Sequence, residues 1–318
     1  MKIAVILPCY KSKDHVLGVL ERIGNEVSVI IAVDDKCPVG TGKFIEEQYK
    51  DKRLHVIYND VNKGVGGAVM HGYAYGLKET EADIFVKIDS DGQMDPALVP
   101  RLVKPIVEKN ADYTKGNRFY RPSYLRTMPK IRLFGNACLS FLTKISSGYW
   151  TMMDPTNGFT AIHRIALSQL ELDRISERYF FESDMLYHLN LVRAVTLDMP
   201  MTAVYGDEES GLKIRDIIGQ FLTKNVKNII KRVFYDYGLR NFSVGSSYLL
   251  FAIIFILFGV IFGLINWIES IQTGEAATSG TVMIAGLPII IGIQFLNSFI
   301  TYDVANVPRV PLQKLMID

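Results

Sequence analysis

The first part of the chain alternates short apolar runs with helix-like stretches. Four apolar runs have the length and the branched or aromatic composition of buried strands, and they cover residues 3–7, 27–33, 54–58 and 84–88. Stretches with helical spacing follow the first three runs, at about 13–23, 42–49 and 65–78. Strands that alternate with helices predict a parallel sheet covered by helices. The expected fold class is therefore α/β, with a mostly parallel sheet.

Polar residues gather where each predicted strand ends. These segments are Pro8-Cys9-Tyr10, Asp34-Asp35, Asn62-Lys63-Gly64 and Asp89-Ser90-Asp91-Gly92-Gln93. In open α/β sheets, ligands bind beside the carboxyl ends of the strands. Two carboxylates two residues apart suit a hard divalent cation such as Mg²⁺ that also holds diphosphate oxygens. The alternative for this acidic segment is a structural turn, because Asp, Ser and Gly all favour turns.

Two long segments near the C-terminus contain no charged residue. Each exceeds the roughly 20 apolar residues that span a bilayer, so we expect two transmembrane helices, at about 243–267 and 280–302. Trp267 and Tyr302 stand at the ends of these segments, where aromatic residues mark the membrane interface. A buried core helix of this length is the less favoured alternative.

Basic residues flank the predicted spans on one side only. Residues 212–240 contain seven Lys or Arg against two Asp, residues 268–280 contain neither Lys nor Arg, and the tail after Tyr302 carries Arg309 and Lys314. The positive-inside rule then places both termini and the N-terminal domain in the cytoplasm, in a multi-pass protein of the plasma (inner) membrane. No signal peptide is expected, because the chain starts directly with the first predicted strand.

Apolar residues recur at helical spacing among the basic residues that precede the first span. This pattern is typical of an amphipathic helix in the membrane interface, and packing against the soluble domain is the alternative. We therefore expect a soluble domain over 1–210, amphipathic interfacial helices over 211–240 and a membrane region over 241–318.

Several classes of protein are disfavoured by the composition and the motifs. The net charge of +2 is uninformative about nucleic acid, but the soluble part has no basic patch with interleaved aromatic residues, so no nucleic-acid partner is expected. Cys9, Cys37 and Cys138 have no metal-ligand or redox spacing. The first strand is not followed by a dinucleotide-binding glycine motif, and Phe44 stands where a P-loop requires Ser or Thr. Neither a nicotinamide-dependent enzyme nor a P-loop ATPase is favoured.

In their order along the chain, the strand-end motifs resemble those of family 2 glycosyltransferases. The resemblance covers about residues 1–200 and is nearest to the polyprenyl-phosphate branch, with its dolichyl-phosphate mannose synthases and bacterial undecaprenyl-phosphate glucosyltransferases. It implies a GT-A-type domain followed by interfacial helices and two transmembrane helices. It also implies inverting transfer of a hexose from a nucleotide diphosphate sugar, with a UDP-sugar favoured, to a polyprenyl phosphate on the cytoplasmic face. The implied cofactor is Mg²⁺ or Mn²⁺.

The resemblance assigns donor and metal contacts to particular residues. Asp91 is the expected direct metal ligand, and Asp89 and Gln93 belong to the same metal motif, nearer the nucleotide sugar. The segment from Asn62 is expected to offer backbone N–H groups at a helix start to the phosphates. For Asp34, cap chemistry and ligand contact are equally compatible with the sequence. The residues expected to bind the nucleotide sugar are Pro8, Tyr10, Asp34, Asp35, Asn62, Lys63, Gly64, Asp89 and Gln93.

Further family positions concern the acceptor. Arg118 and Arg132 correspond to positions implicated in binding the lipid phosphate, for which a planar guanidinium is well suited. Asp154, in an Asp-x-x-x-Gly-Phe element, is the candidate general base. Glu182 and Asp184 do not share a helix face, so only one of them, expected to be Asp184, points into the site. The expected catalytic residues are thus Asp91, Asp154 and Asp184.

Two other functions stay open on the sequence alone. The acceptor could be a hydroxyl of a lipid-linked oligosaccharide, which needs a general base, whereas a phosphate is already an anion at neutral pH. The chain could also be an inactive, transferase-like membrane scaffold. Gly259 and Gly263 form a G-x-x-x-G pair that could pack helices together in a homo-oligomer, although membrane helices are rich in glycine in any case.

Overall fold

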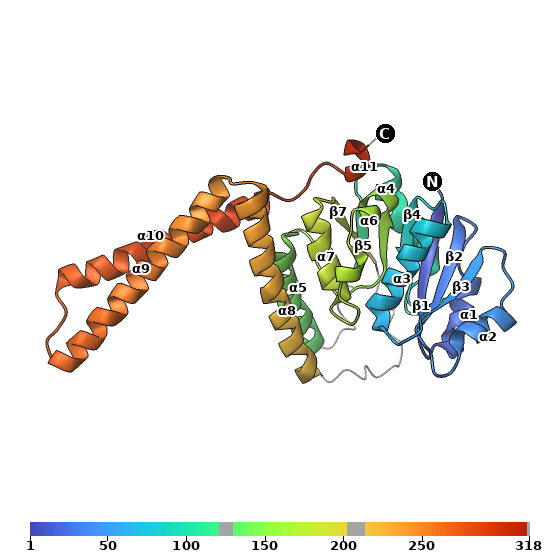
Figure 1. The fold of residues 1–318 in the computed structure, drawn as a ribbon, viewed down its shortest axis with the longest axis horizontal. Helices are drawn as coiled ribbons and strands as arrows, with labels where there is room; N and C mark the ends of the chain where they lie inside the picture. Colours follow the sequence, from blue (N-terminus) through green and yellow to red (C-terminus); the bar gives the residue numbers. More distant parts are fainter. Residues whose placement is uncertain (121–129, 202–213, 317–318) are drawn as a thin grey trace. The chain divides into compact units, whose positions relative to one another are not determined.

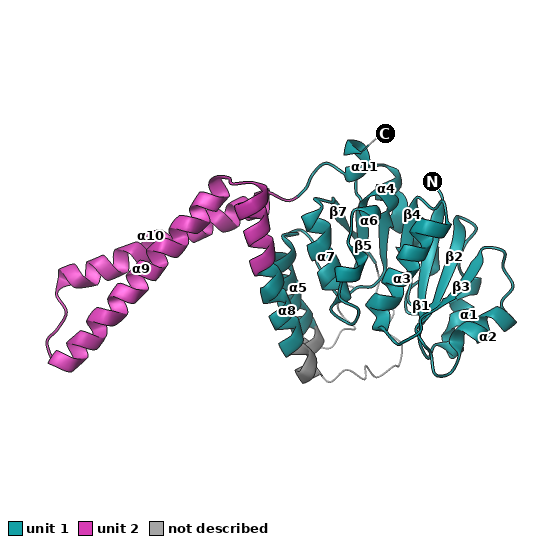
Figure 2. Ribbon diagram, viewed as in Figure 1, with its two compact units in different colours: residues 1–229, 308–318 teal, residues 230–307 magenta. Residues whose placement is uncertain are grey.

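The computed structural model describes residues 1–120, 130–201 and 214–316. The chain forms two compact units (Figure 2), which are Met1–Ile229 together with Pro308–Asp318, and Ile230–Val307. The first unit contains the sheet, and the second contains two long apolar helices.

The first unit is built on a seven-stranded sheet (Figure 1). The strands lie in the order β3-β2-β1-β4-β6-β5-β7, and β6 runs antiparallel to both of its neighbours. The other strand pairs are parallel, which confirms the predicted mostly parallel α/β sheet. The strands are β1 (Ile3–Cys9), β2 (Val27–Asp34), β3 (Leu54–Tyr58), β4 (Ile84–Lys87), β5 (Tyr113–Asn117), β6 (Thr160–His163) and β7 (Thr196–Pro200).

Helices cover both faces of this sheet. All seven residues of β1 are buried, as expected for a central parallel strand. Successive side chains of a strand point to opposite faces, so Val5 and Leu7 join one core cluster with α1 and α4, whereas Ile6 meets Gly72 of α3. The helices are α1 (Lys13–Glu21), α2 (Thr41–Gln48), α3 (Gly64–Glu79), α4 (Val99–Val107), α5 (Lys130–Ser147), α6 (Arg164–Ser168), α7 (Phe181–Leu191) and α8 (Ile214–Phe234), with the 3-10 helices η1 (Pro96–Leu98) and η3 (Leu172–Arg174).

The first part of α8 packs one of its faces on the sheet unit. Asn225 is fully buried and accepts a hydrogen bond from Ser146 of α5 (2.6 Å), and Asn228 donates to Asp184 of α7 (2.7 Å). Leu222 and Val226 lie on the other face and are exposed. The helix thus packs on the sheet unit, which was the alternative for this segment, and it also keeps an apolar outer face. Its place in a membrane interface stays a prediction.

The C-terminal tail is part of the sheet unit. Asp112, fully buried beside the start of β5, accepts hydrogen bonds from the backbone N–H groups of Leu312 (2.9 Å), Gln313 (3.3 Å) and Val195 (2.8 Å). The tail segment α11 (Leu312–Leu315) is therefore fastened to the sheet unit by a buried carboxylate.

The second unit is a hairpin of α9 (Val244–Thr273) and α10 (Ser279–Ala305). Both helices are long and apolar enough to cross a membrane, with mean hydropathies of 2.9 and 1.9 in their most apolar windows. A Cβ on Gly259 would lie 2.6 Å from the carbonyl oxygen of Ala285, and one on Gly263 would lie 3.3 Å from the Ala285 side chain. The glycine pair therefore packs the hairpin of one chain, and the suggestion that it joins copies of the chain finds no support here.

An ion-pair cluster closes the base of this hairpin. The buried Arg232 at the end of α8 pairs with Asp303 of α10 (2.7 Å), and the hydroxyl of Tyr237 donates to the same carboxylate (2.6 Å). Tyr237 belongs to the π-helical segment η4 (Tyr235–Arg240), which links α8 to α9.

Candidate active site

A cavity of about 510 Å³, here called the strand-end pocket, opens at the carboxyl ends of β1 and β4. The strand order reverses at this point, because β2 and β3 lie to one side of β1 and β4 lies on the other. The volume falls in the range of small-molecule sites. Seven of the residues predicted to bind donor or metal line this pocket, namely Pro8, Tyr10, Asp35, Asn62, Gly64, Asp89 and Asp91.

Asp35 organises the wall of the pocket where α3 begins. Its carboxylate accepts hydrogen bonds from the backbone N–H groups of Lys63 (2.9 Å) and Gly64 (2.7 Å) and from the side chain of Asn59 (2.7 Å). The first N–H groups of a helix lack partners within the helix and favour a negative charge. The expectation that the N–H groups of Lys63 and Gly64 face the donor phosphates is wrong, because Asp35 takes both.

Asp34 lies outside the strand-end pocket, although it precedes Asp35 directly. Its two carboxylate oxygens accept hydrogen bonds from the backbone N–H groups of Cys37 and Gly42, both at 2.7 Å. Gly42 is in the first turn of α2. Asp34 therefore has the cap role, and its predicted contact with the nucleotide sugar is not what the structure shows.

Asp89 and Asp91 bring two carboxylates to the strand-end pocket. Gly92 follows with a left-handed φ of 81°, and the Gln93 backbone N–H donates to Asp91 Oδ1 (2.9 Å). The turn after β4 therefore presents the carboxylates of Asp89 and Asp91 to the same pocket. Gln93 lines a separate, wider hollow together with Asp91, so it is the member of the predicted metal motif that lies outside the pocket.

The two carboxylates fit a divalent cation. Over 1–120, 130–201 and 214–316, no group of three or more His, Cys, Asp or Glu side chains could hold a metal ion by itself. A pair of carboxylates beside an open pocket matches a cation that keeps several waters and takes further ligands from substrate phosphates, as Mg²⁺ does. Asp89 and Asp91 are the residues that would hold it.

Lys87 is a buried cation next to Asp89. Its Nζ lies 2.7 Å from Asp89 Oδ1 and 3.7 Å from Glu182 Oε1. Gly158 covers the pair so closely that a Cβ there would lie 2.8 Å from Asp89 Oδ2. Sequence reasoning missed this residue, although a lysine inside an apolar strand is a usable signal, because a buried lysine needs a counter-charge.

Glu182 faces the Lys87–Asp89 ion pair, and Asp184 does not. The Asp184 carboxylate accepts hydrogen bonds from the Ser176 backbone N–H (2.8 Å) and from the Asn228 side chain (2.7 Å). The prediction that Asp184 points into the site is therefore wrong, because residues two apart lie on different sides of α7 and Glu182 takes the side toward Lys87. Burial raises the pKa of Glu182 to about 7, against the attraction of Lys87.

Arg118 and Asp154 form a bidentate ion pair. Arg118 Nε donates to Oδ2 (2.7 Å), Nη2 donates to Oδ1 (2.6 Å), and the Arg118 backbone N–H also donates to Oδ2 (3.1 Å). Asp154 is fully buried. Burial alone would raise the pKa of Asp154, but Arg118 outweighs it and holds the pKa below its usual value. A carboxylate held in this way orients Arg118 and is a poor proton acceptor, which argues against Asp154 as the general base.

Lys115 holds the loop that carries Asp154. This fully buried lysine of β5 donates hydrogen bonds to the carbonyl oxygens of Met153 and Asp154. Its Nζ also lies 3.2 Å from Asp198 Oδ1 on β7, and Asp198 accepts a hydrogen bond from the Met153 backbone (2.6 Å). These contacts keep Asp154 at its left-handed φ of 55°.

Three more residues complete the account of the site. Arg178 and Tyr179, in the loop before α7, line the strand-end pocket and are exposed, and no motif in the sequence pointed to them. Arg132, the second arginine predicted to bind the lipid phosphate, belongs to α5, but its side chain lies outside the described residues.

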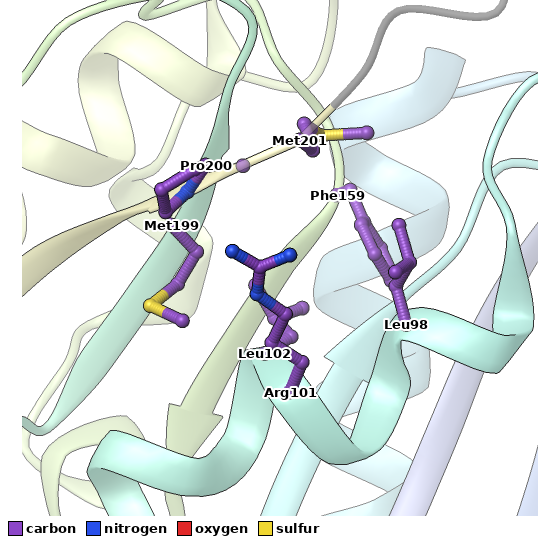
Figure 3. Close-up of a pocket in the computed structure, with 8 residues that line it drawn as sticks. Leu98, Arg101, Leu102, Phe159, Met199, Pro200 and Met201 are labelled. Atoms are coloured by element: carbon purple, nitrogen blue, oxygen red, sulfur yellow. The ribbon is translucent and has the colours of Figure 1, made fainter. Parts of the chain in front are cut away.

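Another, much smaller cavity lies against α4 and the end of β7 (Figure 3). It has a volume of about 10 Å³, and Leu98, Leu102, Phe159 and Met201 are among the residues that line it. A space of this size holds about one water molecule. It is too small to be a substrate site.

Comparison with known proteins agrees with the motifs. The model of glycosyl transferase family 2 matches residues 4–171. The chain is similar to a UDP-N-acetylglucosamine–dolichyl-phosphate N-acetylglucosaminyltransferase of Methanococcus voltae, with 28% identity over 217 residues that cover 64% of this chain and 86% of the relative. It is also similar to an undecaprenyl-phosphate mannosyltransferase of Micrococcus luteus, with 29% identity over 208 residues that cover 64% of this chain and 84% of the relative.

A solved structure shares the fold. Glucosyl-3-phosphoglycerate synthase from Mycobacterium tuberculosis, in complex with Mn²⁺ and UDP-glucose, matches with a TM-score of 0.52 and 20% identity, over 73% of this chain and 78% of that chain. At this identity the likeness concerns the fold alone. It agrees with the GT-A-type domain that the sequence predicted.

Proposed function

The chain belongs to glycosyl transferase family 2 and is a glycosyltransferase, and we propose that it transfers a hexose from a nucleotide diphosphate sugar, with a UDP-sugar favoured, to a polyprenyl phosphate. The strand-end pocket is the observation that carries this proposal, because Asp89 and Asp91 stand there beside the residues expected to hold the nucleotide. The names of the two relatives mention dolichyl and undecaprenyl phosphate, which supports a polyprenyl-phosphate acceptor.

The charges at the pocket suit the departure of a nucleoside diphosphate. Breaking the bond at the anomeric carbon builds positive charge on the sugar and negative charge on the leaving diphosphate. A divalent cation, Mg²⁺ or Mn²⁺, held by Asp91 and Asp89 would supply a Lewis acid for that negative charge. Lys87 pairs with Asp89 and so fixes the direction of this carboxylate.

Arg118 supports a phosphate acceptor. A guanidinium presents five N–H donors in one plane and pairs well with phosphate oxygens. Asp154 accepts from two of its nitrogens and fixes the plane of the group. A phosphate with a second pKa near 6 is already an anionic nucleophile at neutral pH. It needs no strong base, which agrees with an Asp154 whose pKa is held low by Arg118.

The proposal includes a place in the membrane. α9 and α10 would anchor the chain as a multi-pass protein of the plasma membrane, with both termini and the catalytic domain in the cytoplasm, because Lys and Arg gather on that side. Leu222 and Val226 on the outer face of α8 would lie in the interface. A polyprenyl phosphate presents its head group at this level.

The proposal is tested with membranes that contain the full chain. They are incubated with polyprenyl phosphate and labelled UDP-glucose, UDP-galactose, UDP-N-acetylglucosamine or GDP-mannose, and the lipids are then extracted. We expect one of the labels to enter a lipid that mild acid cleaves, and we expect a chelator to prevent this.

The matched control is Asp91→Asn, which removes one pocket charge and keeps the size of the side chain. A labelled product that is stable to mild acid would point to a hydroxyl acceptor and overturn the proposed acceptor. If no label is transferred and no nucleotide sugar binds, the chain is an inactive scaffold and the proposed activity is wrong.

A further inference from the structure

Arg178 is a cation at the strand-end pocket that the proposed mechanism does not use. The charged side chains that line the pocket include Asp35, Asp89 and Asp91, and on the basic side Lys11 and Arg178. Asp35 is engaged by the start of α3, and Asp89 is engaged by Lys87. Within the described part of the chain, the Arg178 side chain makes no hydrogen bond or ion pair. Its charge is therefore available to a ligand of the pocket.

The backbone of Arg178 is fastened to the first turn of α3. The carbonyl oxygen of Glu177 accepts a hydrogen bond from the Gly67 backbone N–H (2.9 Å), and the Ser176 N–H donates to Asp184 (2.8 Å). The carbonyl oxygen of Arg178 itself accepts from the N–H of Phe181 (2.9 Å). Arg178 therefore begins from a fixed backbone position, unlike an arginine at the tip of a free loop.

The glycines of α3 show how closely this loop approaches the helix. A Cβ on Gly66 would lie 2.5 Å from the Ser176 carbonyl oxygen, and one on Gly64 would lie 3.0 Å from the Glu177 carbonyl oxygen and 3.1 Å from Arg178 Cγ. A Cβ does not fit at the 2.5 Å found for Gly66, and Gly64 has a left-handed φ of 80°, so both positions favour glycine. The stem of Arg178 thus rests on the helix start that forms the pocket wall.

We propose that Arg178 is a phosphate-binding residue of the strand-end pocket. An arginine fork makes paired, charge-assisted hydrogen bonds to phosphate oxygens. The other acidic and basic side chains that line the pocket include Lys11, His15 and three carboxylates, so Arg178 would add a fixed positive charge to that of the divalent cation proposed there. The inference rests on the proposed function for its two phosphate sources, which are the diphosphate of the donor and the phosphate of the polyprenyl acceptor. Both offer the same oxygen chemistry to the guanidinium.

The test compares three variants of the full chain in detergent micelles. Arg178→Ala removes the fork, Arg178→Lys keeps only a point charge, and Arg174→Ala is the matched control, because Arg174 is also exposed and close in sequence but pairs with Glu171 and does not line the pocket. The probes are UDP and GDP with Mg²⁺, and a short-chain polyprenyl phosphate. Binding is measured by calorimetry, and thermal unfolding confirms that each variant folds.

We expect Arg178→Ala to weaken the binding of one phosphate probe by about 10- to 100-fold, the size of a lost charge-assisted hydrogen-bond pair. Arg178→Lys should restore part of this loss. A change for UDP or GDP alone assigns Arg178 to the donor diphosphate, and a change for the lipid phosphate alone assigns it to the acceptor.

The proposal fails if Arg178→Ala binds all probes as tightly as Arg174→Ala does, or if the wild-type chain binds none of them. A wild-type chain that binds the probes but transfers no sugar to lipid would overturn the proposed function and leave the role of Arg178 standing. The two failures are therefore distinguishable.

Discussion

The ion pair between Arg118 and Asp154 allows a quantitative test of the site. The perturbation is Asp154→Asn, which removes the negative charge and keeps the size of the side chain. Asp154 is fully buried, and the Arg118 side chain is 16% exposed. The substitution therefore leaves a guanidinium in a poorly solvated place without its counter-charge.

The structure sets the size of the expected effect. Removing one partner of a buried ion pair costs about 3–5 kcal/mol, because the remaining charge is uncompensated. Asparagine keeps one acceptor oxygen and Arg118 keeps some contact with water, so we expect the lower end, about 3 kcal/mol. In a domain of roughly 150–250 residues, each kcal/mol lowers the Tm by about 2–4 °C. The expected decrease is therefore about 6–12 °C.

The assay is thermal unfolding of the full chain, followed by the near-ultraviolet signal of the sheet unit. Asp154→Asn, Arg118→Met and the double variant form a cycle, whose coupling energy should lie near the upper end of the usual range, at about 2–3 kcal/mol. A Tm decrease of less than about 2 °C for Asp154→Asn, with a coupling energy near zero, would refute the reasoning.

Asp154→Asn should also change how the free energy of unfolding depends on pH under acidic conditions. Arg118 lowers the pKa of Asp154 in the folded chain. The ionised Asp154 therefore contributes fully to the free energy of unfolding above the pKa of the unfolded state, about 3.9. This contribution is lost as the pH falls through the lower pKa of the folded state. Between neutral pH and about pH 3, the wild type should lose more stability than Asp154→Asn.

In activity assays, a phosphate acceptor predicts a modest loss of activity for Asp154→Asn and a rate that rises through about pH 6. A hydroxyl acceptor predicts a loss of activity of about 10²–10⁴-fold.

Four further outcomes are expected. Asp91→Asn should abolish sugar transfer with an unchanged Tm, because it removes one anchor of the cation; unchanged activity in this variant and in chelator would remove the metal from the mechanism. Arg118→Lys should keep donor binding and weaken the use of the lipid phosphate, since a point charge does not replace the planar fork; a loss of donor binding instead would move Arg118 to the diphosphate. Asp112→Ala should lower the free energy of unfolding by about 1–3 kcal/mol, because buried N–H groups lose their acceptor. It should also speed hydrogen exchange at the amides of the C-terminal tail, and exchange at the same rate in the variant and the wild type would disprove the docking of the tail. Gly259→Leu should separate α9 from α10, because a Cβ at this position would lie 2.6 Å from a carbonyl oxygen of α10. Cysteine cross-linking between the two helices should then decrease, and unchanged cross-linking would contradict this packing.

Several features of the fold could be predicted because their signals are local. The apolar runs of the N-terminal part became strands of a mostly parallel sheet, since short runs of branched residues bury themselves on both faces. Asp89 and Asp91 lie at the pocket because the carboxyl ends of parallel strands meet at one edge. The two charge-free segments became long apolar helices. In each case the period or length of a pattern carries the information.

The direction of each polar side chain could not be predicted from such patterns. Asp34 and Asp35 are neighbours with the same chemistry, yet one caps α2 and the other binds the start of α3 at the pocket. Glu182 and Asp184 share a helix, and only the positions of Lys87 and Asn228 decide which carboxylate turns to which side. These choices depend on partners far apart in the chain.

The sequence by itself therefore determined the fold class, the pocket edge with its two carboxylates and the pair of long apolar helices, because hydrophobic period and strand-end position are properties of consecutive residues. Only the tertiary structure decided that Asp154 orients Arg118, that Asp35 takes the N–H groups of α3 and that Arg178 reaches the pocket. The physical reason is that a buried charge or N–H group must find a partner, and the nearest partner in space is set by how the elements pack, not by their order in the chain.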